Sequence, residues 1–261
     1  MNARPYLREV SLKGNGIEGA GAYPFDIPAV RKLDRLQFHR DVTFLIGENG
    51  CGKSTLLEGI AVAWGFNPEG GSKNFHFSTR ASHSELHQHL RLVKSASRPK
   101  DGFFLRAESF FNVATSIDEI DADPAGGAPI IGAYGGRSLH EQSHGESFLA
   151  LLLLRFRGRG LYILDEPEAA LSPTRQLAVL CRMHQLVQAE SQFIVATHSP
   201  IIMAYPGARI LLLDADGFRA VRYEETEHYA VTREFLSDPG HMLKQLLAGD
   251  GKETKRARPR R

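Results

Sequence analysis

Four short, nearly continuous runs of apolar residues lie along the chain, at residues 42–46, 161–164, 193–196 and 210–213. Their length and their content of β-branched and aromatic residues predict strands buried inside the protein. Further apolar segments after Ser54, Phe148 and Pro173 predict helices, and the proline is typical of a first helical position. Alternating strands and helices predict an α/β fold with a mostly parallel central sheet.

A phosphate-binding loop follows the first of these strands. Its pattern, G-x-x-x-x-G-K-[ST], is matched by Gly47, Glu48, Asn49, Gly50, Cys51, Gly52, Lys53, Ser54 and Thr55. The glycines let backbone N–H groups approach phosphate oxygens at the start of a helix, where the helix dipole favours negative charge. We expect Lys53 to contact the β and γ phosphates and the Ser54 hydroxyl to ligate Mg²⁺. The sequence thus predicts a P-loop NTPase that binds ATP.

Two consecutive acids, Asp165 and Glu166, end the strand at residues 161–164. Open α/β sheets place their ligands at the carboxyl ends of strands, so both acids are candidates for the nucleotide site. Asp165 would hold Mg²⁺ beside Ser54, and Glu166 would polarise the attacking water as the catalytic base. The alternative is structural, with both acids capping the helix that follows.

Two further motifs flank this strand. Ser143 and Gly145 stand at the predicted start of the helix containing residues 148–154, an arrangement suited to an anion. His198 ends the strand at residues 193–196, where a histidine taken alone would more often be a loop residue than a catalytic one.

The order and spacing of these motifs resemble the ATP-binding-cassette ATPases. Gly145 precedes Asp165 by 20 residues, and His198 follows Asp165 by 33. The resemblance covers residues 1 to about 215 and implies that Ser143 and Gly145 contact the γ-phosphate bound to the opposite subunit. It also implies that His198 is the switch histidine, that residues 169–172 cross between subunits, and that a head-to-tail homodimer encloses two ATP molecules.

Within that superfamily the motifs differ from those of transporters, which usually have L-S-G-G-Q and D-E-P-T-x-x-L-D. This chain has S-H-G-E at 143–146 and D-E-P-E-A-A-L-S-P at 165–173. The second form is similar to soluble AAA-labelled ATPases near the chromosome-maintenance, recombination-repair and Old-type defence branch, whose members commonly work with DNA or an effector protein. Glu108 takes the place of the transporters' lid glutamine.

Composition and charge set the expected organisation. The 261 residues, 42% of them hydrophobic, predict one ATPase domain over residues 1–251 with a helical lobe inserted at about 65–142. Residues 232–247 predict two short amphipathic helices that pack on the core or dock a partner. The tail at 252–261 carries six basic residues and one acid, which predicts disorder and either a solubilising end or a contact with DNA phosphates.

Only two cysteines, Cys51 and Cys181, occur, so a disulfide framework is not expected and a reducing compartment is favoured. The longest apolar run, 148–154, is far shorter than the roughly 20 residues of a membrane span. Together these features predict a soluble, cytoplasmic, Mg²⁺-dependent ATPase that drives a partner protein or a DNA transaction. Two alternatives stay open: the energy-coupling subunit of a transporter, and a regulatory module that binds ATP with little turnover.

Overall fold

The computed structural model describes residues 4–14, 21–73, 84–108, 110–122, 130–214 and 216–249. The chain divides into two compact units, one ending at Val221 and the other beginning at Arg222. The single ATPase domain expected over residues 1–251 stays a prediction. The predicted tail at 252–261 lies outside the described residues.

A six-stranded sheet in the order β5-β6-β7-β3-β8-β9 forms the centre of the first unit. Its strands are β3 (Val42–Gly47), β5 (Asp101–Arg106), β6 (Gly160–Asp165), β7 (Gln192–Ala196), β8 (Arg209–Asp214) and β9 (Gly217–Val221). All neighbours pair in parallel except β8 and β9, which are antiparallel. The predicted α/β fold with a mostly parallel sheet is confirmed.

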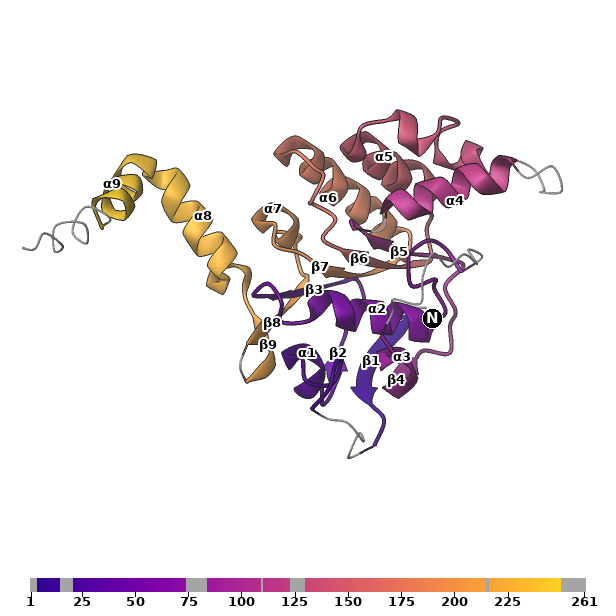
Figure 1. Ribbon diagram of the computed structural model, residues 1–261, viewed down its shortest axis with the longest axis horizontal. Helices are drawn as coiled ribbons and strands as arrows, with labels where there is room; N and C mark the ends of the chain where they lie inside the picture. Colours follow the sequence, from indigo (N-terminus) through magenta and orange to yellow (C-terminus); the bar gives the residue numbers. More distant parts are fainter. Residues whose placement is uncertain are drawn as a thin grey trace, which may run out of the picture. The chain divides into compact units, whose positions relative to one another are not determined.

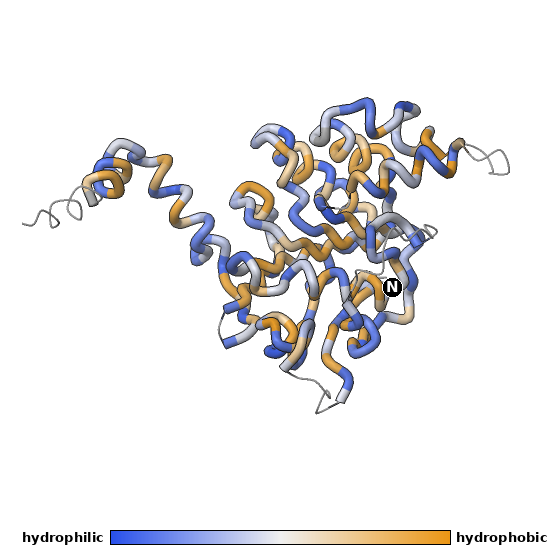
Figure 2. The backbone as a smooth tube through the Cα atoms, viewed as in Figure 1, coloured by the Kyte–Doolittle hydropathy of each residue, from blue (hydrophilic) through white to orange (hydrophobic). Residues whose placement is uncertain are grey.

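Every residue of β3, β6 and β7 is buried because helices cover both faces of the sheet. Figure 1 shows α2 (Lys53–Trp64) on one face and α6 (Pro173–Gln188) on the opposite face. The hydropathy of the backbone follows this layering, with the most apolar stretches along the strands (Figure 2). The continuous apolar runs in the sequence therefore correspond to the strands with two covered faces.

A second, antiparallel sheet has the order β2-β1-β4. Its strands are β1 (Leu7–Leu12), β2 (Leu36–Gln37) and β4 (Leu90–Lys94), and the short helices α1 (Pro28–Arg31) and α3 (Leu86–His89) lie near it in the chain. Leu7, Val10 and Leu90 belong to the same hydrophobic cluster as Leu57 and Ile60 of α2. Packing on this sheet fixes the direction of α2 beyond the phosphate loop.

The predicted helical lobe at 65–142 is only partly helical. It contains β4 and also β5, whose central residues Phe103, Phe104 and Leu105 are fully buried beside β6. Its helical portion continues past residue 142, because the elements there pack together as one group (Figure 1). These elements are α4 (Phe110–Ala122), η1 (Ile131–Tyr134), η2 (Leu139–Glu141), α5 (His144–Ala150) and η3 (Leu151–Arg155). A further short helix, α7 (Pro200–Met203), follows β7.

The second unit consists of η4 (Tyr223–Glu225), α8 (Glu227–Ser237) and α9 (Pro239–Gly249). Both helices are amphipathic, as predicted, yet their apolar residues are not core residues: Leu236, Leu246 and Leu247 are 69%, 63% and 70% exposed. Whether residues 232–247 pack on the core or dock a partner stays a prediction. Helices of about three turns bury too little surface on each other to enclose these side chains.

Candidate functional site

The phosphate loop connects the end of β3 to the start of α2, as the sequence predicted. Gly52 is the residue before α2 and has a φ of 95°, a left-handed conformation that favours glycine. A Cβ at Gly47 would lie 2.6 Å from the backbone oxygen of Leu213 on the neighbouring strand β8. The loop thus needs glycine at Gly52 for its turn and at Gly47 for the close approach of two strands.

Lys53 folds back over this loop. Its side chain is buried, and its Nζ donates hydrogen bonds to the backbone oxygens of Gly47 at 2.8 Å and Glu48 at 2.9 Å. Glu48 and Asn49 are exposed, whereas Cys51 and Thr55 are half-buried. The lysine charge is therefore held at the loop itself, where phosphate oxygens can replace the two carbonyls as acceptors.

Ser54 and Asp165, the two predicted Mg²⁺ ligands, are in direct contact. The Ser54 hydroxyl donates to Oδ1 of Asp165 at 3.0 Å. Burial raises the pKa of Asp165 to about 7, although Arg106 and the Ser54 hydroxyl partly oppose that shift. A hydroxyl and a buried carboxyl side by side suit Mg²⁺, which binds oxygen ligands, keeps several waters and would favour the charged carboxylate.

Glu166 and His198 approach each other at the carboxyl edge of the sheet. His198 Nε2 lies 3.8 Å from Glu166 Oε1, and the Glu166 side chain is 45% exposed and so open to water. Burial and the nearby Lys53 charge lower the pKa of His198, while Glu166 opposes this. The histidine is thus neutral near pH 7. Glu166 itself has a φ of 50°, an uncommon conformation for a residue with a side chain.

Glu168 is a site residue to which the sequence analysis gave no role. Its Oε1 accepts hydrogen bonds from the backbone N–H of His198 at 2.6 Å and of Ser199 at 3.1 Å. It therefore ties the segment after β6 to the segment after β7 and sets the backbone position of the histidine. The sequence does contain a signal for this role, because Glu168 is the second glutamate of D-E-P-E. In the sequence analysis that glutamate only distinguished this chain from transporter ATPases.

Arg106 is a second residue that sequence reasoning missed. It ends β5 opposite Asp165, donates to Glu58 Oε2 of α2 at 2.6 Å, and places its Nε 3.9 Å from Asp165 Oδ2. Glu108, predicted at the lid position, is 85% exposed and lies 3.3 Å from the same guanidinium. A charged residue at the end of an apolar strand is a sequence signal for a site residue. The sequence does not show its partners, because Glu58 and Asp165 belong to other elements.

Ser143 and Gly145 lie beside residues 169–172 and not beside the phosphate loop. Ser143 is exposed and caps α5, and its hydroxyl donates to Glu146 at 2.8 Å. A Cβ at Gly145 would lie 2.5 Å from the backbone oxygen of Ala170. Figure 1 shows α5 on the α6 side of the central sheet, opposite α2. Within one chain, the two predicted signature residues are therefore not next to Lys53.

Known proteins with related sequences carry the same kind of domain. A Haemophilus influenzae protein named "Uncharacterized ABC transporter ATP-binding protein" is 30% identical over 198 residues, which cover 70% of this chain and 74% of that relative. The chain belongs to the ABC-type ATPases. Family models match residues 17–108, described as "AAA domain", and residues 130–204, described as "AAA domain, putative AbiEii toxin, Type IV TA system".

One solved structure agrees with the fold of this ABC-type ATPase, and a second is only a similar chain. An ATP-binding cassette of an ABC transporter in its ADP conformation has a TM-score of 0.50 and 17% identity, covering 90% of this chain and 95% of that one. An SMC head bound to the C-winged helix domain of ScpA has a TM-score of 0.47 and 14% identity, covering 83% and 98%. No helix within the described residues of this ABC-type ATPase is long and apolar enough to cross a membrane.

Proposed function

We propose that this ABC-type ATPase hydrolyses ATP with Mg²⁺ at composite sites of a head-to-tail homodimer. The observation that carries the proposal is the convergence of five side chains at one edge of the central sheet. Ser54 touches Asp165, and Glu166 approaches His198, whose pKa responds to Lys53. These residues follow three strand ends, and their proximity supports one site with Lys53 as the phosphate-binding cation, Ser54 and Asp165 as the metal-binding pair, and Glu166 as the base.

The residues divide the chemistry among them. Lys53 exchanges its hydrogen bonds to the loop carbonyls for phosphate oxygens. Ser54 and Asp165 would hold Mg²⁺, which supplies charge stabilisation to the phosphates when it is bound. Glu166, half-exposed at the strand end, accepts the proton of the attacking water, and neutral His198 donates a hydrogen bond beside it.

The homodimer follows from the position of the signature residues. Helix α5, which contains Gly145 and is capped by Ser143, lies on the opposite side of the sheet from α2 (Figure 1), so a site assembled from one chain would lack them. A second copy in head-to-tail orientation would supply them to the γ-phosphate. The packing of Gly145 on Ala170 supports this, because residues 169–172 would then reach the interface together with the signature.

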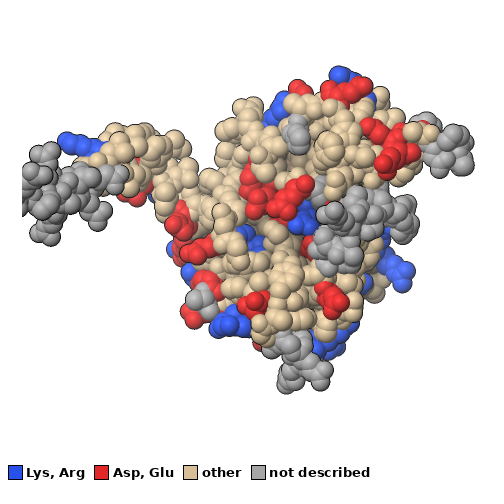
Figure 3. Space-filling model, in the orientation of Figure 1, with Lys and Arg blue, Asp and Glu red and all other residues tan. Residues whose placement is uncertain are grey.

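We further propose that the ATP cycle drives a partner protein or a DNA transaction in the cytoplasm. The free thiols of Cys51 and Cys181 support a reducing compartment. The face shown in Figure 3 mixes acidic and basic side chains and has no broad basic stretch among its described residues. The six basic residues of the tail at 252–261 are one candidate for a contact with DNA phosphates. A transporter energy-coupling role is the second candidate, favoured by the name of the Haemophilus influenzae relative.

Glu166→Gln tests the catalytic proposal. It removes the base but keeps the size of the side chain, so turnover should fall by ~10²–10⁴-fold while ATP binding persists. With ATP and Mg²⁺ the variant should accumulate as a dimer in size-exclusion chromatography with light scattering. Glu141→Gln, at an exposed position, is the matched control. Full turnover in Glu166→Gln would exclude Glu166 as the base.

Mixing two inactive variants tests the shared site. Lys53→Ala disables nucleotide binding, and Ser143→Arg disables the signature that one subunit presents to the other. A hybrid dimer of the two keeps one intact composite site, so activity should return on mixing. If the mixture regains no turnover although the two variants still form dimers, the proposal that the signature acts on the nucleotide of the other subunit is contradicted. Co-purification of a membrane protein with the Glu166→Gln variant would instead favour the transporter role.

A further inference from the structure

A hollow of about 530 Å³ lies where the two sheets of the first unit meet, away from the phosphate loop. It is bounded by the last residue of α2, Trp64, by Lys73, and by the segment from Lys94 to Pro99 that connects β4 to β5. Its volume is within the range of small-molecule sites, about 300–1,000 Å³. Because α2 rises about 1.5 Å per residue, the eleven residues from Lys53 to Trp64 separate the hollow from the phosphate loop by roughly 16 Å.

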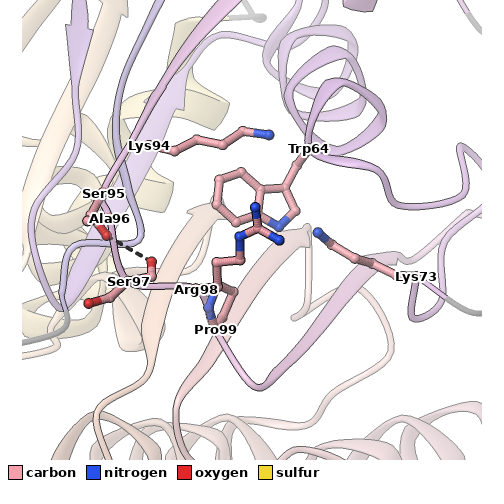
Figure 4. Close-up of a pocket in the computed structure, with 8 residues that line it drawn as sticks. All are labelled: Trp64, Lys73, Lys94, Ser95, Ala96, Ser97, Arg98 and Pro99. Carbon is pink, nitrogen blue, oxygen red and sulfur yellow. Dashed lines mark hydrogen bonds between the residues drawn. The ribbon is translucent and has the colours of Figure 1, made fainter.

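Three cationic side chains converge in this hollow. Figure 4 shows Lys73, Lys94 and Arg98 all directed toward the indole of Trp64. The Lys73 ammonium lies 5.0 Å from the centre of the indole and the Lys94 ammonium 4.5 Å from the same point, so both charges lie beside one ring. No carboxylate occurs among the described residues that line the hollow. Like charges are thus concentrated without an internal counter-ion.

The pKa of Lys73 reflects the positive charges that surround it. Burial, followed by the charges of Lys94 and Arg98, lowers the pKa of Lys73. An anion in the hollow would relieve the mutual repulsion of the three cations. The cation–π contacts of the two lysines with the indole offset part of this repulsion, but they supply no counter-charge.

Trp64 provides a second, independent observation. Its indole is 7% exposed, and its Nε1–H is buried without a hydrogen-bond partner among the described residues. A buried donor without an acceptor is costly, and binding sites are one place where such groups occur. The wall of the hollow thus presents an unused N–H donor beside three cations.

We propose that this hollow binds a compact anion with clustered phosphate groups, at a site separate from the ATP-binding loop. Lys73, Lys94 and Arg98 would contact the phosphate oxygens, with Arg98 able to bind two oxygens at once. The three cations surround one small volume instead of following a line, which suits an oligophosphate better than the extended backbone of a nucleic acid. Two ammonium groups already lie 4.5–5.0 Å from the centre of the indole, which disfavours a base stacked on the same ring.

The sole tryptophan of the sequence makes the test direct, because intrinsic fluorescence reports on this hollow. The experiment titrates the full-length protein, saturated with ADP and Mg²⁺, with inorganic tripolyphosphate at constant ionic strength. We expect a saturable change in Trp64 emission as the anion draws the ammonium groups from the ring. Lys73→Ala or Lys94→Ala should weaken this binding by about tenfold, the lower end of the effect of one charge-assisted hydrogen bond.

Arg91→Ala is the matched control, since Arg91 is an exposed cation on the same strand, three residues before Lys94 and hence on the opposite face. Arg91→Ala should leave the titration unchanged. Lys94→Arg keeps the positive charge and should retain binding, so a loss of binding in Lys94→Ala can be assigned to the lost charge and not to misfolding. ADP affinity should be the same in all variants. Absence of a saturable response, or equal affinities across the variants, would overturn the proposal. A response to single-stranded or duplex DNA but not to tripolyphosphate would also overturn it, because the hollow would then bind nucleic acid.

Discussion

Glu168 offers a quantitative test of how the end of β7 is held in place. Its Oε1 is the acceptor for two backbone donors, the N–H groups of His198 and Ser199, at 2.6 and 3.1 Å. Glu168→Ala removes this acceptor and leaves both donors without it. Glu168→Gln keeps an oxygen at the same place, so the two variants separate the hydrogen bonds from the charge.

The expected magnitude follows from the two donors. In Glu168→Ala the His198 N–H loses its acceptor, whereas the Ser199 N–H keeps Thr197 Oγ1 at 3.0 Å. One buried N–H without an acceptor costs about 1–3 kcal/mol, which for a domain of this size corresponds to a fall in Tm of roughly 2–12 °C. Glu168→Gln should cost less than half as much. ATP turnover should fall in Glu168→Ala as well, because the backbone of His198 is no longer fixed.

Thermal unfolding of the two variants, with the exposed Glu141→Ala as control, measures the effect. Circular dichroism at a single low ionic strength is sufficient, and ATPase assays on the same preparations give the second readout. If Glu168→Ala unfolds at the same temperature as Glu168→Gln and as the control, Glu168 does not hold the segment after β7, and the reasoning fails.

The pKa of Glu168 predicts how the contribution of this residue to stability changes with pH. Burial raises the pKa of Glu168 above its ordinary value of 4.5, although the backbone N–H of His198 opposes the shift. The folded protein therefore binds this proton more tightly than the unfolded chain does. The stabilisation is complete below about pH 4.5 and is lost as the pH rises through the folded pKa. Across a pH series, the unfolding free energy of wild type minus that of Glu168→Gln should decrease with rising pH.

Three further substitutions test other parts of the site. Lys53→Ala should abolish most of the thermal stabilisation by ATP, because the phosphates lose their principal cation; an unchanged shift would remove Lys53 from the site. Gly145→Ala should destabilise the protein by about 1–3 kcal/mol through the clash of the new Cβ with Ala170, and a Tm equal to wild type would contradict the close packing. Arg106→Ala should destabilise by about 2–4 kcal/mol, since Glu58 is left partly buried without its cation, and Arg106→Lys should recover part of this in urea titrations.

Local sequence determined much of the chain's architecture. The continuous apolar runs indicated strands with two covered faces, and β3, β6 and β7 are buried along their whole length. The glycines of the phosphate loop, the lysine and the serine could be assigned because strand, loop and helix are adjacent in the chain. Backbone conformation and the start of a helix are local properties, so a single stretch of sequence is sufficient to predict them.

Contacts between distant segments could not be obtained in this way. Arg106 and Glu58 are 48 residues apart, and Glu168 reaches the N–H of His198 from 30 residues away. Only the order of strands in the sheet brings these groups together, and no local pattern encodes that order. The same holds for the pairing of β4 with β1, which placed strands inside an interval expected to be helical.

For helices α8 and α9 the sequence predicted the elements but not what covers them. Their amphipathic pattern predicted α8 and α9 as helices, and that is how they fold. The pattern did not determine what covers the apolar faces, and in the structure Leu236 and Leu247 are exposed. Periodicity reports which residues share a face of a helix, because this depends only on the 3.6-residue repeat. Which surface covers such a face depends on contacts between segments far apart in the sequence, and for the strands of the first unit only the tertiary structure decided those contacts.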